Sequence, residues 1–356
     1  METTPSVKNR NYGLDQLRAI LMLLGIPYHA ALVLGTTSWI YNSKKHQTLL
    51  ADIFTTISHS FRMESFFFLS GYFLYIVLKN KGVPFIVKSR VKKVLIPFIT
   101  AIFIVTIPQL NLVGWIYNKA PSYDAGNIIS HLWFLLSLLL ISFLFINSKI
   151  RYLIDKLFVI NISPVTFIAS VAIIFYCMQV ARKVFVTHFG DMPQLTTCFS
   201  LLYITVHYSV FFAMGYGVGF KCKYLLSLLS LNKKIIATSL VILLIIKVMA
   251  SMYSIGYIGP IMDVLIPTFA IILLFNFFSG DHFTESKLVK KLVDASLVVY
   301  IFHHFFIILL AYVLDDVISS TLAYYASIIC LSTALSFFIY WLLSKAKPTR
   351  FIFGIR

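Results

Sequence analysis

Charged residues are scarce in this chain. Only 12% of its 356 residues are Asp, Glu, Lys or Arg, whereas a soluble globular domain has roughly 25%. Hydrophobic residues make up 59% of the sequence, so a water-exposed surface could not be covered by the polar residues present. The composition therefore excludes an ordinary soluble domain and indicates that most of the exterior faces lipid.

Cysteine pairs and nucleotide-binding loops are also lacking. The four cysteines are scattered and form no CxxC pair, which argues against a zinc site or a disulfide framework. No GxSxG, Walker or GxGxxG motif indicates a serine hydrolase, a P-loop enzyme or a dinucleotide-binding fold. The net charge of +17 is not accompanied by a groove-reading motif, so we expect no nucleic-acid partner.

Long apolar runs recur along the sequence instead. About 20 apolar residues cross a hydrocarbon core as a helix, and a helix satisfies its own backbone polar groups there. We predict an all-α integral membrane protein with one transmembrane domain, residues 1–356, and a short turn at 254–257. The ten or so predicted spans are 14–35, 50–78, 94–113, 131–148, 157–181, 198–220, 235–253, 258–279, 292–314 and 321–344.

Positive charges lie mostly on one side of this predicted topology. If the N-terminal tail with Lys8 and Arg10 is cytoplasmic, 22 of the 30 Lys and Arg residues are cytoplasmic. Five are on the other side and three lie within spans. Cytoplasmic loops of membrane proteins are enriched in Lys and Arg, so we expect both termini inside.

The first predicted span contains three ionisable residues, which are costly inside a membrane and therefore candidate functional residues. Asp15, Arg18 and His29 are spaced to share one helical face. Arg18 and His29 are roughly 16 Å apart along a helix, so Arg18 lies near the cytoplasmic end and His29 in the outer half. Pro27 predicts a kink just before His29. We favour a function for His29, whereas Asp15 and Arg18 could equally form an interfacial ion pair.

The second predicted span contains His59, Arg62 and Glu64. His59 and Arg62 share a predicted helical face, and Glu64 points elsewhere. Because an unpaired arginine inside a membrane is costly, we expect a carboxylate such as Glu64, Asp15 or Asp263 beside Arg62. A buried ion pair and a substrate-binding role both remain open for this group.

Further histidines are predicted at the depth of His29. The helix directions place the following residues in the outer half of the membrane or at its outer edge: His59, His131, His207, Asp263, His303 and His304. Because histidine exchanges a proton near neutral pH, this group predicts a polar cavity open to the outside. We expect no metal site, since no HExxH or comparable ligand spacing occurs.

A basic segment, residues 88–93, follows the second span on the predicted cytoplasmic side. Its cations are Lys88, Arg90, Lys92 and Lys93. These side chains could bind the phosphates of an acyl-coenzyme A. The more common role of such a segment is to set the topology and contact anionic lipid.

Several motifs at these positions resemble the membrane-bound acyltransferase-3 family. The family pattern of an arginine, ten residues and a histidine in the first helix corresponds to Arg18 and His29. Further matches are FFLSGYF at 67–73, HLWFL at 131–135, and the segment 295–303 with its Ala-Ser-Leu start. The resemblance covers nearly the whole chain and implies a membrane acyltransferase.

A narrower resemblance concerns a subgroup of that family. Segments 21–27, 58–63 and 129–136 are similar to members associated with succinylation of periplasmic glucans. Phe305 departs from the subgroup, where a proline is expected after the paired histidines. The resemblance implies a multi-pass protein of the bacterial inner membrane, with glucan-synthesis proteins as candidate partners.

The resemblance also implies substrates and roles. We predict transfer of a succinyl group from a cytoplasmic thioester to hydroxyls of periplasmic glucans. The expected donor is an acyl-coenzyme A, namely succinyl-coenzyme A, and no permanently bound cofactor is expected. The predicted catalytic residues are His29, Asp15 and Arg18, with His29 as general base or transient acyl carrier. The predicted substrate-binding residues are His59, Arg62, Glu64, His131, Trp133, Tyr300 and His303. The predicted donor phosphate-binding residues are Lys88, Arg90, Lys92 and Lys93.

Two alternatives stay open at this point. The first is an O-acetyltransferase that acts on another surface polysaccharide, because no readable code in the short loops specifies the acceptor. The second is a proton-coupled transporter or flippase, since ionisable residues inside a membrane suit a proton relay equally well. The sequence shows no repeated halves of the kind that many transporters have.

Overall fold

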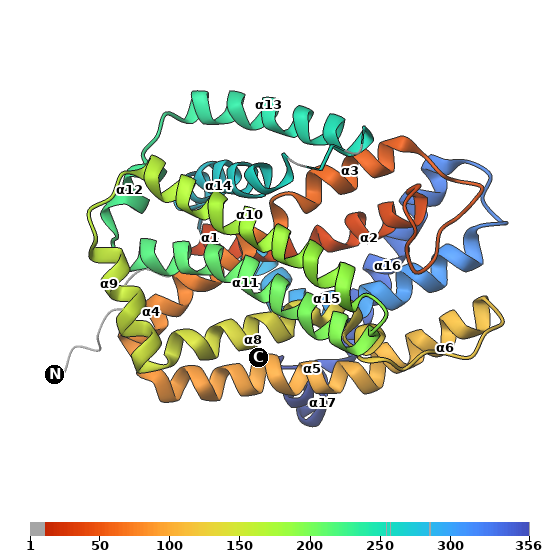
Figure 1. The fold of residues 1–356 in the computed structure, drawn as a ribbon. Helices are drawn as coiled ribbons and strands as arrows, with labels where there is room; N and C mark the ends of the chain where they lie inside the picture. Colours follow the sequence, from red (N-terminus) through yellow and green to blue (C-terminus); the bar gives the residue numbers. More distant parts are fainter. Residues whose placement is uncertain (1–10, 254, 257, 285, 356) are drawn as a thin grey trace.

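The computed structural model is a bundle of long helices, and it describes residues 11–253, 255–256, 258–284 and 286–355 (Figure 1). Within these residues no strand occurs, and nine helical runs are long and apolar enough to cross a membrane. The predicted all-α transmembrane architecture is confirmed. Of the residues used in the predictions, Lys8 and Arg10 in the tail and residues 254 and 257 in the short turn lie outside the described residues.

The helices of the first two runs build most of the site. The first run consists of α1 (Tyr12–Leu23) and α2 (Gly25–Leu34). The second run consists of α3 (Leu49–His59), α4 (Arg62–Arg90), the π-helix η1 (Val91–Leu95), α5 (Ile96–Ala101), the π-helix η2 (Ile102–Thr106) and α6 (Ile107–Ile116).

The remaining helices follow in chain order. They are α7 (Ala125–Ile129), the 3-10 helix η3 (Ser130–Leu132), α8 (Trp133–Ile146), α9 (Ser148–Val159), α10 (Pro164–Phe189), α11 (Pro193–Gly219), α12 (Lys223–Leu229), α13 (Lys233–Met252), α14 (Gly259–Phe278), α15 (Lys287–Leu314), α16 (Thr321–Leu343) and α17 (Lys347–Ile352).

The second run accounts for two predicted crossings. It is 68 residues long, far more than one crossing needs. Gly82, with φ of 73° and ψ of 177°, interrupts the helical backbone, and the chain then returns alongside itself (Figure 1). The left-handed φ is one that glycine adopts without steric cost. Counted as two crossings, this run brings the described helices to the ten that the sequence predicts.

Two further breaks lie next to predicted site residues. Pro27 has no N–H to donate to the carbonyl of Leu23, and the first run is interrupted at Leu24, as the expected kink requires. The predicted span 50–78 is likewise two helices, α3 and α4, because the backbone leaves the helical region at Phe61 (φ −146°, ψ −17°). The hydroxyl of Ser60 donates to the carbonyl of Thr56 at 2.6 Å, a local bond that bends helices.

The centre of the bundle is held by direct backbone packing of α4 on α11. A Cβ on Gly71 would overlap the carbonyl oxygen of Phe212, and a Cβ on Gly215 would overlap that of Phe68. Small residues allow this close approach of helices inside a membrane. The glycine-rich segment at 215–219 is therefore a packing motif.

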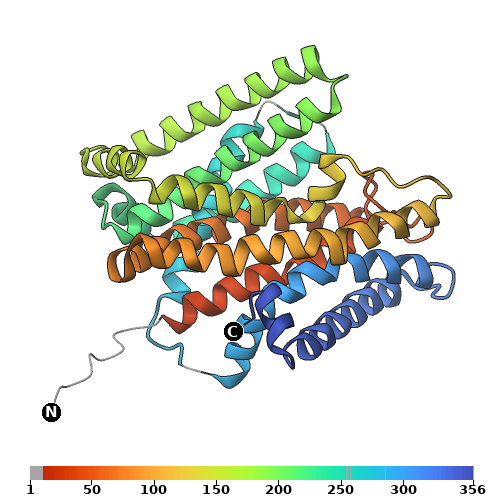
Figure 2. The ribbon, with the colours of Figure 1, turned by 90° about the horizontal axis from the view of Figure 1, so that it is seen from below.

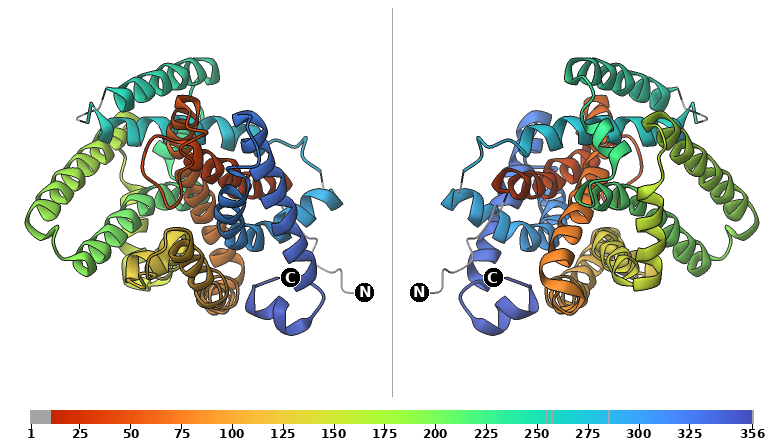
Figure 3. Two further views of the ribbon diagram at one scale, coloured as in Figure 1. Left: turned by 90° about the vertical axis from the view of Figure 1, so that its right-hand side faces the viewer. Right: turned by 90° about the vertical axis from the view of Figure 1, so that its left-hand side faces the viewer.

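The outer helices differ from this centre. Figure 3 shows α10 and α13 at the periphery, and only 11% of the most apolar window of each is buried inside the bundle. Their apolar surfaces are available to lipid. On the other side, Figure 2 shows α16 and α17 packed beside α15. The C-terminal residues return to the core, where Phe353 is buried with its ring 5.5 Å from that of Phe302.

Candidate functional site

Four histidines from three elements meet in the interior, and we call them the histidine cluster: His29 on α2, His131 on η3, and His303 and His304 on α15. The ring centroid of His29 lies 5.3 Å from that of His303 and 4.8 Å from that of His304. The rings of His131 and His304 stack at 4.4 Å. His29 is half-buried and the other three are buried. The structure thus unites most of the histidines predicted to lie at one depth.

Backbone carbonyls fix which ring nitrogens carry protons in two of these histidines. His303 Nδ1 lies 2.6 Å from the carbonyl oxygen of Tyr300, and His131 Nε2 lies 3.1 Å from that of Ile301. A carbonyl only accepts, so each of these nitrogens donates. In the neutral rings, Nε2 of His303 and Nδ1 of His131 are then acceptors, and both are buried without a protein partner.

Two more polar contacts hold the cluster. His304 Nδ1 lies 2.8 Å from Oε1 of Gln109 on α6, and the Tyr300 hydroxyl donates to the carbonyl of His131. His29 itself stacks on Trp39 at 5.8 Å, and its Nδ1 is buried without a protein partner. The supporting rings are therefore oriented by fixed hydrogen bonds, whereas the His29 ring is held by aromatic contacts.

Arg62 brings a positive charge to this cluster. Its side chain is buried, and its Cζ lies 4.6 Å from the centre of the Tyr28 ring, a cation–π contact. Gly25 makes the approach possible: a Cβ on this residue would be 2.9 Å from Arg62 Nη1 and 3.4 Å from His303 Nε2. The missing side chain at Gly25 thus lets the guanidinium and the His303 ring face the same point.

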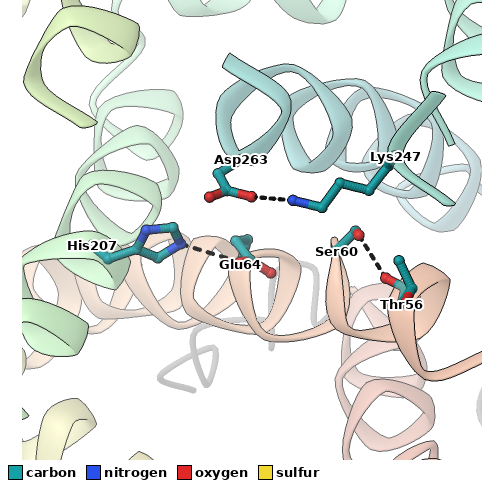
Figure 4. Close-up of polar contacts among 6 residues, drawn as sticks. All are labelled: Thr56, Ser60, Glu64, His207, Lys247 and Asp263. Carbon is teal, nitrogen blue, oxygen red and sulfur yellow. Dashed lines mark hydrogen bonds and ion pairs between the residues drawn. The ribbon is translucent and has the colours of Figure 1, made fainter. Parts of the chain in front are cut away.

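The carboxylate partners expected for Arg62 are engaged elsewhere. Glu64 Oε1 pairs with His207 Nε2 at 3.2 Å, and Asp263 Oδ1 pairs with Lys247 Nζ at 2.7 Å (Figure 4). The expectation that either carboxylate pairs with Arg62 is wrong. Residues two apart on a helix point about 200° apart, so Glu64 faces α11 while Arg62 faces the Tyr28 ring.

A basic cavity of 490 Å³ lies at the end of the bundle where α1 begins and α4 ends. Its charged lining comprises Asp15, Arg18, Lys81, Arg90, Lys93 and Asp294. Four cations and two carboxylates give it an excess positive charge. Arg18 and Arg90 line the same cavity, so both would stabilise an anion bound there.

The four cations of the predicted basic segment, residues 88–93, fall into two groups by position. Arg90 and Lys93 line the basic cavity together with Arg18. Lys88 and Lys92 are exposed and do not line it, and the ammonium of Lys92 lies 5.8 Å from the Phe351 ring centre instead. The structure therefore places two of the four predicted phosphate-binding residues where a donor could reach both them and Arg18.

A second cavity, of 760 Å³, lies toward the other end of the bundle, and we call it the paired-charge cavity. Its charged lining consists of Glu64, Arg182, Lys247 and Asp263, with His59 and His207 beside them. Trp133, Tyr203 and Tyr208 supply aromatic surface. Figure 4 shows two of its polar contacts: the Glu64–His207 hydrogen bond joins α4 to α11, and the Lys247–Asp263 ion pair joins α13 to α14.

The histidine cluster lies between these cavities and lines neither. The basic cavity extends inward to Phe134, whose ring is 5.3 Å from that of Tyr300. On the other side, the Tyr28 ring contacts His29 at 4.9 Å and stacks on His59 of the paired-charge cavity at 6.0 Å. A substrate in either cavity is thus one aromatic layer away from the histidines.

Sequence reasoning assigned no role to several residues that the structure places here. Gln109 and Lys247 are polar residues within apolar spans, so the cost of burying them was a usable signal. His207 and His304 were part of the predicted polar group but had no stated role, and Asp263 was expected only as a partner of Arg62. Tyr28 carried no signal, because aromatic residues are common in apolar spans, and Trp39 carried none because it lies in a predicted connection between spans.

Comparisons with known proteins agree with this architecture. A family model described as "Acyltransferase domain" matches residues 11–341. A curated relative named "Glucans biosynthesis protein C" from Escherichia coli O157:H7 is 29% identical over 323 residues, which cover 84% of this chain and 83% of the relative. The protein of the same name from Escherichia coli K12 is 28% identical over the same length and coverage. No solved structure matches the chain.

Proposed function

The chain belongs to the acyltransferase-3 family of membrane proteins, and on that premise we propose that it moves a succinyl group from a cytoplasmic thioester to hydroxyls of periplasmic glucans. The observation that carries the proposal is the first helical run. It places Arg18 in the basic cavity and His29 in the histidine cluster. One run thus links a site for an anionic donor to a buried group able to accept a proton.

The donor fits the basic cavity. An acyl-coenzyme A carries several phosphate charges, and phosphate is bound by Lys and Arg side chains. Arg18, Arg90 and Lys93 line the cavity that opens at the predicted cytoplasmic end. Asp15 lies in the same cavity, and we propose that it positions these cations.

A succinyl group explains Arg62 better than an acetyl group does. A buried guanidinium is costly unless it is paired, and Arg62 Nε has no hydrogen-bond partner in the protein. A succinyl group brings a terminal carboxylate, which a guanidinium binds well, whereas an acetyl group brings none. We therefore propose that Arg62 holds the succinyl carboxylate and that His131, Tyr300 and His303 line its path.

The chemistry then centres on His29. The sugar hydroxyl oxygen forms a bond to the acyl carbonyl carbon, and the bond from that carbon to the thioester sulfur breaks. His29 takes the hydroxyl proton and returns it to the departing thiolate, so no other reactant is needed. An intermediate in which the acyl group rests on His29 keeps the same balance in two steps.

Mass spectrometry of periplasmic glucans tests the proposal. Cells that lack the protein are compared with the same cells supplied with the wild type or with His29→Ala at equal membrane levels. We expect succinyl substituents only with the wild type. Unchanged glucans would contradict the proposal, and a change in the acetylation of another surface polysaccharide would identify the acetyltransferase alternative.

A further inference from the structure

The two cavities differ in their balance of charge. In the paired-charge cavity the carboxylates of Glu64 and Asp263 are matched by Lys247 and Arg182, and two contacts of 3.2 and 2.7 Å engage His207 and Lys247. The guanidinium of Arg182 lies over the Tyr203 ring at 5.3 Å. With neutral histidines this lining has no net charge, so it does not select a polyanion as the basic cavity does.

Glu64 offers this cavity an acceptor that the protein leaves unused. Only 6% of its surface is exposed, and its Oε1 receives the contact from His207. Its Oε2 is buried and has no hydrogen-bond partner in the protein. A buried carboxylate oxygen without a donor is costly, and a hydroxyl group is a donor of suitable size.

The aromatic lining lies beside this acceptor. The rings of Trp133 and Tyr208 stack at 5.3 Å with an angle of 20°, and Tyr208 also contacts the ring of His207 at 4.8 Å. Aromatic surface with a few fixed polar groups is the usual composition of a site that orients a small molecule. Sugars present both features that such a lining matches, namely apolar C–H faces and hydroxyl donors.

The cavity also leads to the reacting centre. His59 is exposed within its lining and stacks on Tyr28, whose ring also contacts that of His29. A molecule held beside Glu64 and Trp133 therefore needs only a displacement of Tyr28 to reach His29. The 760 Å³ volume is sufficient for several sugar units in general terms, since ligand pockets commonly measure about 300–1,000 Å³.

We infer that the paired-charge cavity is the acceptor site and binds an uncharged polyhydroxylated chain, a segment of glucan, with Glu64 Oε2 accepting from a sugar hydroxyl. The inference rests on the proposed function, because it locates the acceptor of that reaction. His207 acts as a positioning residue that fixes the other oxygen of Glu64. The Lys247–Asp263 pair, which joins α13 to α14, forms the rim of the same site.

Direct binding to the full chain in lipid nanodiscs tests the inference with two probes. The first probe is unsubstituted periplasmic glucan purified from cells that lack the protein, and the second is coenzyme A. We expect Glu64→Gln and Asp263→Asn each to weaken glucan binding roughly tenfold, because each replaces a charged acceptor by a neutral amide. Coenzyme A binding should change less than about twofold, which also shows that the variants are folded.

A matched variant sharpens the comparison. Asp281→Asn makes the same chemical change just after α14, at an exposed position that lines neither cavity. It should bind both probes like the wild type. If Glu64→Gln and Asp263→Asn bind glucan as the wild type does, the acceptor site is elsewhere while the proposed reaction stands. If the wild type binds coenzyme A but no glucan, the proposed acceptor itself is wrong.

Discussion

The basic cavity and the paired-charge cavity are both lined by aromatic and charged side chains, but they differ in net charge. The first has four Lys and Arg side chains and two carboxylates, whereas the second has two of each. An unbalanced lining concentrates a charged ligand, and a balanced lining favours one recognised by hydrogen bonds and shape. This difference in charge is why we propose the basic cavity for the donor and the paired-charge cavity for the acceptor.

Removal of His29 should separate binding from chemistry, with the largest effect of all. The His29→Ala variant lacks the group that moves the proton, so we expect acyl transfer to fall by roughly 10²–10⁴-fold. Both cavities stay lined as before, so donor and glucan binding should change little. The rate is measured as acylated glucan formed by purified protein in nanodiscs.

The matched control is His188→Ala, because His188 is exposed near the end of α10 and lines neither cavity. It should retain wild-type activity. Substantial acyl transfer by His29→Ala would contradict the proposal that His29 moves the proton in the reaction.

A methyl group at Gly25 should disturb the junction between the cavities. In Gly25→Ala the new Cβ would be 2.9 Å from Arg62 Nη1, so the guanidinium must shift. Because small misplacements in a reacting centre cost up to about 10²-fold, we expect turnover to fall roughly 10–100-fold. Steady-state kinetics with both substrates measures the change.

Gly126→Ala is the corresponding control, since Gly126 lines neither cavity and a Cβ there would be 3.2 Å from its nearest atoms, in the side chains of Asp124 and Thr197. That variant should match the wild type. A Gly25→Ala protein with unchanged turnover would show that the position of Arg62 is unimportant.

Neighbouring cations of the basic segment should differ in their effect on the donor. Arg90→Ala removes a cation that lines the basic cavity, and we expect the KM for acyl-coenzyme A to rise about tenfold. Lys88→Ala, two residues away and exposed outside the cavity, should leave it unchanged. Equal effects of the two variants would mean that only the overall charge of this segment matters.

The C-terminal residues should have the smallest effect. Gly354 lines the basic cavity with φ of 65°, and a Cβ on it would be 3.2 Å from the Cα of Lys93. A left-handed conformation costs a residue other than glycine about 1–2 kcal/mol. We expect Gly354→Ala to weaken coenzyme A binding a few-fold and to leave glucan binding unchanged, as measured by titration of both. A weaker glucan affinity with normal coenzyme A binding would contradict this placement.

The sequence predicted the helical architecture well because each span is a long apolar run, a strong and local signal. It also identified Arg18 and the four members of the histidine cluster, since a polar residue inside a membrane is conspicuous. The break at Phe61 was missed, because backbone angles depend on contacts that a hydropathy pattern does not contain, whereas Gly82 lies in the predicted connection between two spans.

Partners across helices could not be predicted either. Glu64 faces His207, which is 143 residues away in the sequence, and no spacing rule connects them. The division of the basic segment between Arg90 and Lys88 likewise depends on the rotation of a helix about its axis. Such choices are set by tertiary packing, so they appear only when the helices are assembled.

We propose that the acyl group crosses the membrane between two chemically distinct cavities. Proteoliposomes test it directly, with unsubstituted glucan sealed inside and labelled succinyl-coenzyme A added only outside. We expect acylated glucan inside the vesicles, dependent on His29 and absent from protein-free vesicles that are equally impermeable. Acylated glucan formed only when both substrates are on the same side would contradict it.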